Sequence, residues 1–200
     1  MEGDFAWPDV RRSIFDMEGD SSAIRSACQI DWIDMAGFHY GAMSRQYRDA
    51  ADALVEHVEK GRLGKHPEFV LFPVAYLYRH SLELMLKSLV EIISDSGAIQ
   101  KQDLTKNHGL IRLWQTIKPE LIKRWPNADR KPLNNVESLL NDFHKIDKTG
   151  QSLRYHVTKE GKDTRESLPR IIRLDLMKSA FGEMYALLDG CGYGFESDIA

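Results

Sequence analysis

One predicted helix carries four ionisable side chains whose types could support acid–base or phosphate chemistry. Residues 76–89 (YLYRHSLELMLKSL) place Arg79, His80, Glu83 and Lys87 among leucines. His80, Glu83 and Lys87 follow at i, i+3 and i+7 and lie in one line on a helix, while Arg79 and Glu83 form an i, i+4 pair. In a polar groove, His80 would act as an acid or base, and Arg79 or Lys87 would hold a phosphate.

The same four side chains have a second interpretation. Burying any of them without a partner would cost several kcal/mol. In the structural interpretation, they form a salt-bridge network or lie on the solvent-exposed face of the bundle. In the functional interpretation, they line a polar groove with the catalytic residues His80, Arg79 and Glu83. The sequence leaves both interpretations open.

Two other segments add polar groups that could bind RNA or a nucleotide, together with Lys87. His108 stands at a predicted helix start, where free N–H groups favour anions, or it only caps that helix. The run Arg154-Tyr155-His156 could grip and stack on a nucleotide, or it only pins a loop to the rest of the protein.

Metal ions and cofactors are not expected. A helical carboxylate site uses Glu-x-x-His on two helices, whereas this chain has the reverse order, once, at His80 and Glu83. Cys28 and Cys191 lack the spacing of a zinc site and are predicted to be inert. The glycine-rich run 190–194 is predicted to stop the last helix and not to bind phosphate.

The net charge of −3 hides an uneven distribution along the 200 residues. Residues 1–60 carry a net charge of −6, and residues 101–173 carry +7. The basic segment could meet a phosphate-rich partner, or acidic and basic segments could simply pack together as solvated faces.

Apolar periodicity predicts helices throughout and almost no strands, so the fold class is all-α. An apolar stripe on each helix predicts an antiparallel helical bundle of four to five main helices, with a polar loop or small hairpin near 150–170. Pro73 is expected in a first helical turn, and Pro119 is expected to end one helix and start a short turn of another. The expected helices cover 31–60, 70–95, 110–118, 119–125, 132–149 and 175–190.

The chain divides into an N-terminal extension (1–30), the bundle (31–190) and a flexible tail (191–200). The longest nearly apolar run, 69–78, is too short to span a bilayer. The acidic N-terminus has no apolar signal core, which predicts a cytoplasmic protein.

The order of several short motifs resembles bacterial proteins of the HEPN superfamily across residues 31–190. The first motif is the helix run that contains Arg79, His80 and Glu83. Asn107-His108-Gly109-Leu110 and Leu113-Trp114 follow, and then Phe143-His144-Lys145-Ile146-Asp147 and Leu153-Arg154-Tyr155.

The resemblance implies a helical bundle that forms a homodimer and binds RNA or a nucleotide in a prokaryotic antiviral defence or toxin–antitoxin system. It implies cleavage only where the catalytic motif is present. Active members carry Arg, four to six residues, then His, and no histidine of this chain has an arginine at that spacing. The chain is therefore either a metal-independent endoribonuclease with a site built from other residues, or non-catalytic. The alternative from another class is a helical protein-interaction or regulatory module with a partner protein.

Overall fold

The structure, a computed structural model, describes residues 39–62, 66–101, 103–147, 150, 152–155, 157, 161, 163, 166 and 168–197. The predicted extension, Cys28 and His156 lie outside the described residues. The described part contains the 3₁₀ turn η2 (Ser152–Arg154) and five α-helices, which confirms the all-α bundle. The helices are α2 (Tyr40–Glu59), α3 (Glu68–Asp95), α4 (Leu110–Arg124), α5 (Lys131–Ile146) and α6 (Leu174–Glu196).

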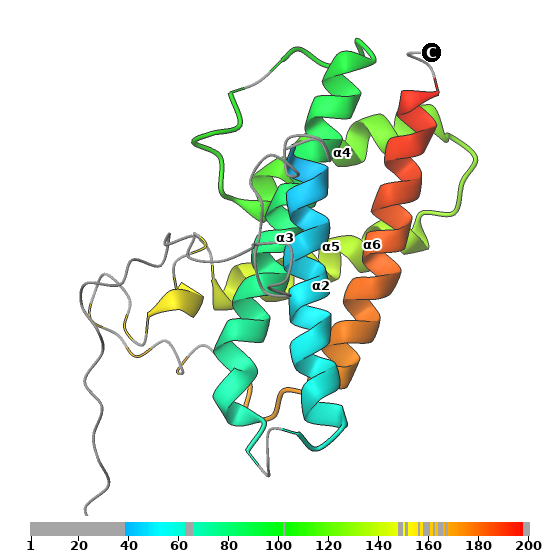
Figure 1. Cartoon of the computed structure of the whole chain (residues 1–200). Coiled ribbons are helices and arrows are strands. Elements are labelled where there is room, and N and C mark those ends of the chain that lie inside the picture. Colours follow the sequence, from blue (N-terminus) through cyan, green and yellow to red (C-terminus); the bar gives the residue numbers. More distant parts are fainter. Residues whose placement is uncertain are drawn as a thin grey trace, which may run out of the picture. The chain divides into compact units, whose positions relative to one another are not determined.

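Helix α3 is the centre of the bundle. It packs against α2, α4, α6 and η2, and α4 in turn packs against α5 (Figure 1). Helices α2 and α3 run antiparallel side by side, as their short connection predicts. Since α3 has neighbours on most sides, its run 81–87 is buried without a break. Any ionisable side chain in that run must find partners inside the protein.

Buried hydroxyls join α2, α3 and α6. Ser44 Oγ donates to the Ser81 carbonyl at 2.7 Å, and Ser81 Oγ donates to the Ser44 carbonyl at 2.9 Å. The Tyr185 hydroxyl of α6 donates to Ser44 Oγ at 2.8 Å. The two serine side chains are small, so the backbones of α2 and α3 can approach closely. Their hydroxyls can be buried there because each one donates a hydrogen bond across the contact.

Pro73 and Pro119 both lie inside helices, which corrects the predicted boundaries of these two helices. Pro119 stands within α4, so the two helices expected on either side of it are one. Gln115 and Pro119 are both exposed, so water can reach the carbonyl that proline leaves without a donor. Pro73 is also exposed and lies in the second turn of α3 rather than the first, because α3 begins at Glu68.

The glycine-rich run 190–194 does not stop α6, contrary to expectation. The helix continues to Glu196, so residues 191–196 of the predicted tail are helical. A Cβ at Gly194 would lie 2.6 Å from the Trp125 ring, and one at Gly192 would lie 3.4 Å from Ile92. At Gly194 glycine permits close packing of α6 against Trp125, whereas a Cβ at Gly192 would make an ordinary van der Waals contact.

Around residues 150–170, the described backbone contains η2 and one isolated antiparallel bridge between Val157 and Asp163. One isolated bridge does not make the small hairpin that was predicted near 150–170 as the alternative to a polar loop. None of the helices within the described residues combines the length and the hydrophobicity that crossing a bilayer requires.

Candidate functional site

The first polar cluster, the buried charge network, consists of Arg79, Glu83, Lys87, His108 and Asp147. Its centre is the Glu83 carboxylate. Oε2 accepts a hydrogen bond from Arg79 Nη1 at 2.8 Å, and Oε1 lies 3.0 Å from Lys87 Nζ and 2.8 Å from His108 Nδ1. One carboxylate therefore pairs with two fixed cations and an imidazole.

The three α3 members of this network are almost completely removed from solvent. Arg79 is 1% exposed, Glu83 is 3% exposed and Lys87 is 4% exposed. Burial opposes ionisation of Glu83, but hydrogen bonds from His108, Arg79 and Lys87 outweigh it and hold the pKa of this carboxyl below its ordinary value. Glu83 is consequently ionised at neutral pH and neutralises part of the buried positive charge.

The remaining donors of Arg79 hold the segment that follows α5. Its Nε donates to the Asp147 carbonyl at 3.3 Å and lies 3.6 Å from Asp147 Oδ2. Its Nη2 donates to the His108 carbonyl at 2.8 Å. Gly150 has a φ of 80°, and a Cβ there would lie 2.9 Å from Arg79 Nη1. Arg79 thus holds both the segment that precedes α4 and the segment that follows α5, and Gly150 leaves room for its guanidinium.

His80 does not join this network. Its ring stacks parallel to Tyr76 with centroids 5.8 Å apart, and meets the edge of Tyr47 at 4.5 Å. Arg154 of η2 places its guanidinium 5.8 Å from the centre of the Tyr76 ring and 6.0 Å from that of Tyr155. We call Tyr76, His80, Arg154 and Tyr155 the aromatic–arginine cluster.

The aromatic–arginine cluster is accessible, unlike the three α3 members of the buried charge network. Arg154 is exposed, Tyr155 is 61% exposed, and Tyr76 and His80 are half-buried. Burial lowers the pKa of His80 below its ordinary value, and the positive charges of Arg79, Lys87 and Arg154 act in the same direction against Glu83. His80 is therefore a neutral imidazole at pH 7, able to accept a proton.

The structure separates residues that the helix pattern had placed together. Arg79, Glu83 and Lys87 share one line, i, i+4 and i+8, whereas His80 points to Tyr76 and Tyr47. The expected catalytic set of His80, Arg79 and Glu83 is split, because two members are buried and paired.

The predicted binding residues are also divided. Lys87 is buried on Glu83, and its Nζ lies 5.5 Å from the centre of the Tyr40 ring, so it is not open to a phosphate. His108 is more than half exposed, and its ring contacts Glu83 instead of capping α4, whose N-cap is Gly109. Arg154 and Tyr155 lie together on the surface.

Sequence reasoning missed Tyr76 and Asp147. Tyr76 stands one helical turn before His80, so the i, i+4 spacing could have found it. Asp147 follows the last residue of α5, and no local pattern links it to Arg79, 68 residues away. Only the tertiary fold reveals that contact.

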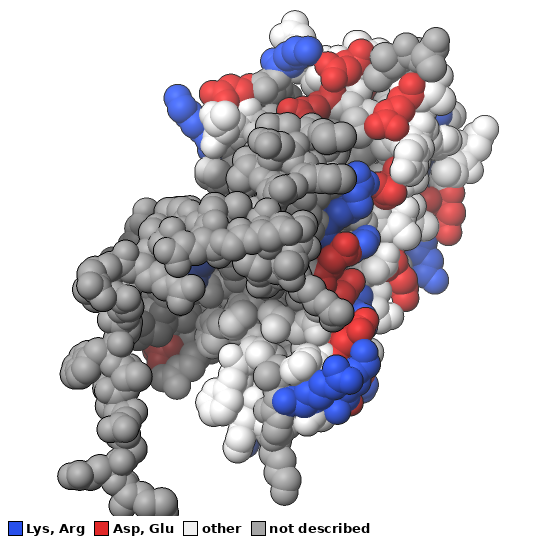
Figure 2. Space-filling view, in the orientation of Figure 1, with Lys and Arg blue, Asp and Glu red and all other residues white. Residues whose placement is uncertain are grey.

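Other chemistry finds little support in the described residues. They contain no group of three or more His, Cys, Asp or Glu side chains that could hold a metal ion. Burial raises the pKa of the Cys191 thiol, which leaves it protonated. In Figure 2, Lys and Arg atoms alternate with Asp and Glu atoms over the described part of the visible face. The described part of this face therefore carries no single positive patch.

Comparison of the chain with models of known protein families, with curated proteins and with solved structures gives no match.

Proposed function

We propose that this chain is a HEPN-like helical domain that binds RNA or a nucleotide through the aromatic–arginine cluster. The observation that carries the proposal is the exposed Arg154 guanidinium packed against Tyr76 and Tyr155. Tyrosine rings offer a flat surface for a nucleobase, and a guanidinium beside them pairs with phosphate in a bidentate manner. The order of sequence motifs supports the family assignment.

The buried charge network supports this proposal as a positioning device. Arg79 holds the Asp147 carbonyl, and Leu153 is buried next to the exposed Arg154. The side of α3 that carries Tyr76 and His80 therefore faces a segment whose position is fixed from inside the bundle. Arg79 and Glu83 act through Arg154 and do not themselves touch the ligand.

Cleavage of RNA would extend the same proposal. Metal-independent cleavage needs a base for the 2′-hydroxyl and a cation for the phosphate. His80 is neutral and half-buried, and its ring and the Arg154 guanidinium each lie 5.8 Å from the centre of the Tyr76 ring, so these two residues would supply the base and the cation. In this proposal the protein is a cytoplasmic homodimer of a prokaryotic antiviral defence or toxin–antitoxin system.

A second candidate is a non-catalytic protein-interaction or regulatory module. The burial of Arg79 and Glu83 favours it, because side chains that are 1% and 3% exposed and paired inside the protein do not contact a substrate. In this case neither RNA nor a nucleotide binds.

Fluorescence anisotropy with a labelled single-stranded RNA of about 16 nucleotides tests the proposal. The affinity should fall by about threefold between about 50 and 200 mM salt, because one bound arginine releases roughly 0.7 counterion from a single strand. Tyr155→Ala should weaken binding by about 1–3 kcal/mol, the value of one stacked base. Arg154→Gln should weaken binding and reduce the salt dependence.

The chain provides a matched control for each variant. Tyr193 is 63% exposed against 61% for Tyr155, and Arg112 is an exposed arginine of α4. Tyr193→Ala and Arg112→Gln should bind like the unmodified protein. Absence of binding to the RNA and to ATP at low salt, or equal losses in control and test variants, would contradict the proposal. Cleavage is tested separately by incubating the protein with total RNA. His80→Gln should abolish any cleavage that the unmodified protein shows.

A further inference from the structure

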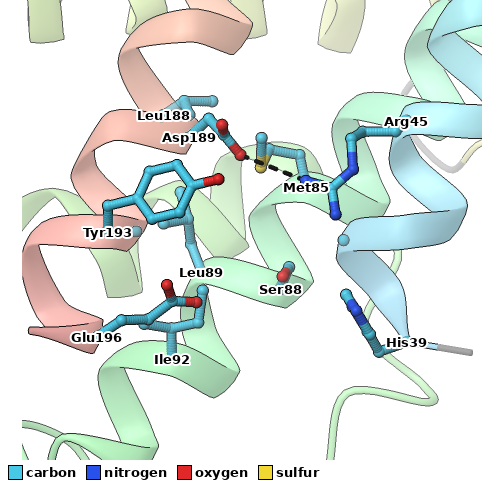
Figure 3. A pocket seen from close by; sticks show the side chains of 12 residues that line it. His39, Arg45, Met85, Ser88, Leu89, Ile92, Leu188, Asp189, Tyr193 and Glu196 are labelled. Atoms are coloured by element: carbon cyan, nitrogen blue, oxygen red, sulfur yellow. Dashed lines mark ion pairs between the residues drawn. The ribbon is translucent and has the colours of Figure 1, made fainter. Parts of the chain in front are cut away.

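A pocket of about 220 Å³ lies between α2, α3 and α6, apart from both polar clusters (Figure 3). The start of α2 and the second halves of α3 and α6 form its walls. Met85, Leu89 and Ile92 of α3 supply apolar surface, and Ser88 adds a hydroxyl. The volume lies below the roughly 300–1,000 Å³ of pockets for drug-sized ligands, so the pocket suits a small metabolite.

The α2 wall attracts negative charge. Arg45 extends into the pocket from α2, and His39 lies below it at the N-cap (Figure 3). His39 Nδ1 accepts a hydrogen bond from the Ala42 backbone N–H at 3.3 Å, so the neutral ring carries its proton on Nε2 and that nitrogen is a donor. The N-terminal end of α2 adds the positive end of a helix dipole.

The α6 wall attracts positive charge. Asp189 and Glu196 present carboxylates from α6, and Tyr193 adds a hydroxyl between them (Figure 3). Glu196 is the last residue of α6, where the helix dipole is negative. The two charged walls therefore face each other across the apolar surface of α3.

The ion pair that spans the pocket is open to replacement. Arg45 Nη1 lies 3.7 Å from Asp189 Oδ1, and their side chains are 47% and 37% exposed. Exposed pairs at this separation contribute little stability. Gly41 lies on the same wall as Arg45, one helical turn earlier, and a Cβ there would lie 3.0 Å from the Ser88 Oγ of α3.

From this arrangement we infer that the pocket binds a small zwitterion of the α-amino-acid class. The carboxylate of the ligand lies toward Arg45 and His39, and its ammonium group lies toward Asp189 and Glu196. The inference does not depend on RNA binding, since no residue of the aromatic–arginine cluster lines this pocket.

Differential scanning fluorimetry with the common L-α-amino acids at millimolar concentration tests the inference, followed by calorimetry on the amino acid that stabilises most. At least one amino acid should raise the melting temperature. Its N-acetyl derivative, which lacks the ammonium group, and its carboxamide, which lacks the carboxylate, should each bind about tenfold more weakly or worse.

Variants assign each ligand group to its wall. Arg45→Gln should weaken binding of the parent amino acid about tenfold and should not weaken the carboxamide further. Glu196→Gln should likewise weaken binding of the parent amino acid about tenfold, and it should not weaken binding of the N-acetyl derivative further. Arg112→Gln and Glu120→Gln, which change residues of α4 away from the pocket, should bind the parent normally. The inference is overturned if no amino acid shifts the melting temperature, if both derivatives bind as well as the parent, or if Arg45→Gln and Glu196→Gln leave affinity unchanged.

Discussion

Replacement of Glu83 by glutamine is the most direct test of the buried charge network. The substitution keeps the shape of the side chain and removes its charge. Arg79 and Lys87 would remain in place, 1% and 4% exposed, without the carboxylate whose oxygens lie 2.8 and 3.0 Å from their nitrogens. Asp147 would still face Arg79, but Lys87 would lose its ion pair within the described part of the chain.

Removing one partner of a buried ion pair costs about 3–5 kcal/mol, because the other charge stays buried without compensation. For a chain of this size, 1 kcal/mol corresponds to roughly 2–4 °C in melting temperature. We therefore expect Glu83→Gln to lower the free energy of unfolding by about 3–5 kcal/mol and the melting temperature by roughly 6–20 °C.

Urea unfolding followed by circular dichroism measures the change, and Glu56→Gln is the matched control. Glu56 also pairs with two cations, Lys60 and Lys178, each at 3.1 Å, but on the surface. Its loss should lower stability far less, because water replaces the lost partner. Glu83→Gln combined with Lys87→Met should regain part of the loss, since one uncompensated charge is then gone. Equal effects of Glu83→Gln and Glu56→Gln would refute the reasoning that burial makes this network indispensable.

Three further predictions follow from single positions. Gly150→Ala should lower the melting temperature more than Gly61→Ala, as thermal melts of both variants will show. Both alanines cost about 1–2 kcal/mol in a left-handed backbone conformation. Only at position 150 would the new Cβ also press on the buried guanidinium of Arg79. Because burial lowers the pKa of His80 below its ordinary 6.5, the unfolded chain takes up this proton more readily. The neutral imidazole of His80 contributes fully to stability above pH 6.5, and the free energy of unfolding declines as the pH falls below that value. Urea unfolding at a series of pH values below 6.5 should therefore show a free energy of unfolding that depends less on pH for His80→Gln than for the unmodified protein. Tyr185→Phe should cost about 0.5–1.5 kcal/mol by removing the donor to Ser44 Oγ, and an unchanged denaturation midpoint would contradict the importance of that bond.

Much of the fold could be predicted from the sequence because helix signals are local. Apolar residues recur every three or four positions, so the existence of the main helices followed from nearby residues alone. Boundaries were harder to predict. The run 190–194 has the composition of a helix stop, but α6 continues through it, and Gly194 packs against Trp125 so closely that a Cβ would lie 2.6 Å from the ring. Packing partners distant in the sequence overrode the local preference of glycine.

The candidate site shows the same division. From the sequence alone, four ionisable groups on one apolar helix required either partners or solvent, and spacing alone paired Arg79 with Glu83. The tertiary structure decided which groups became inaccessible, because α3 lies at the centre of the bundle and buries Glu83 and Lys87. It also brought Arg154 over Tyr76, 78 residues earlier in the chain, a contact that depends on how η2 packs against α3. Periodicity determines which side chains share a face of a helix, whereas only the packing of helices determines what each face meets.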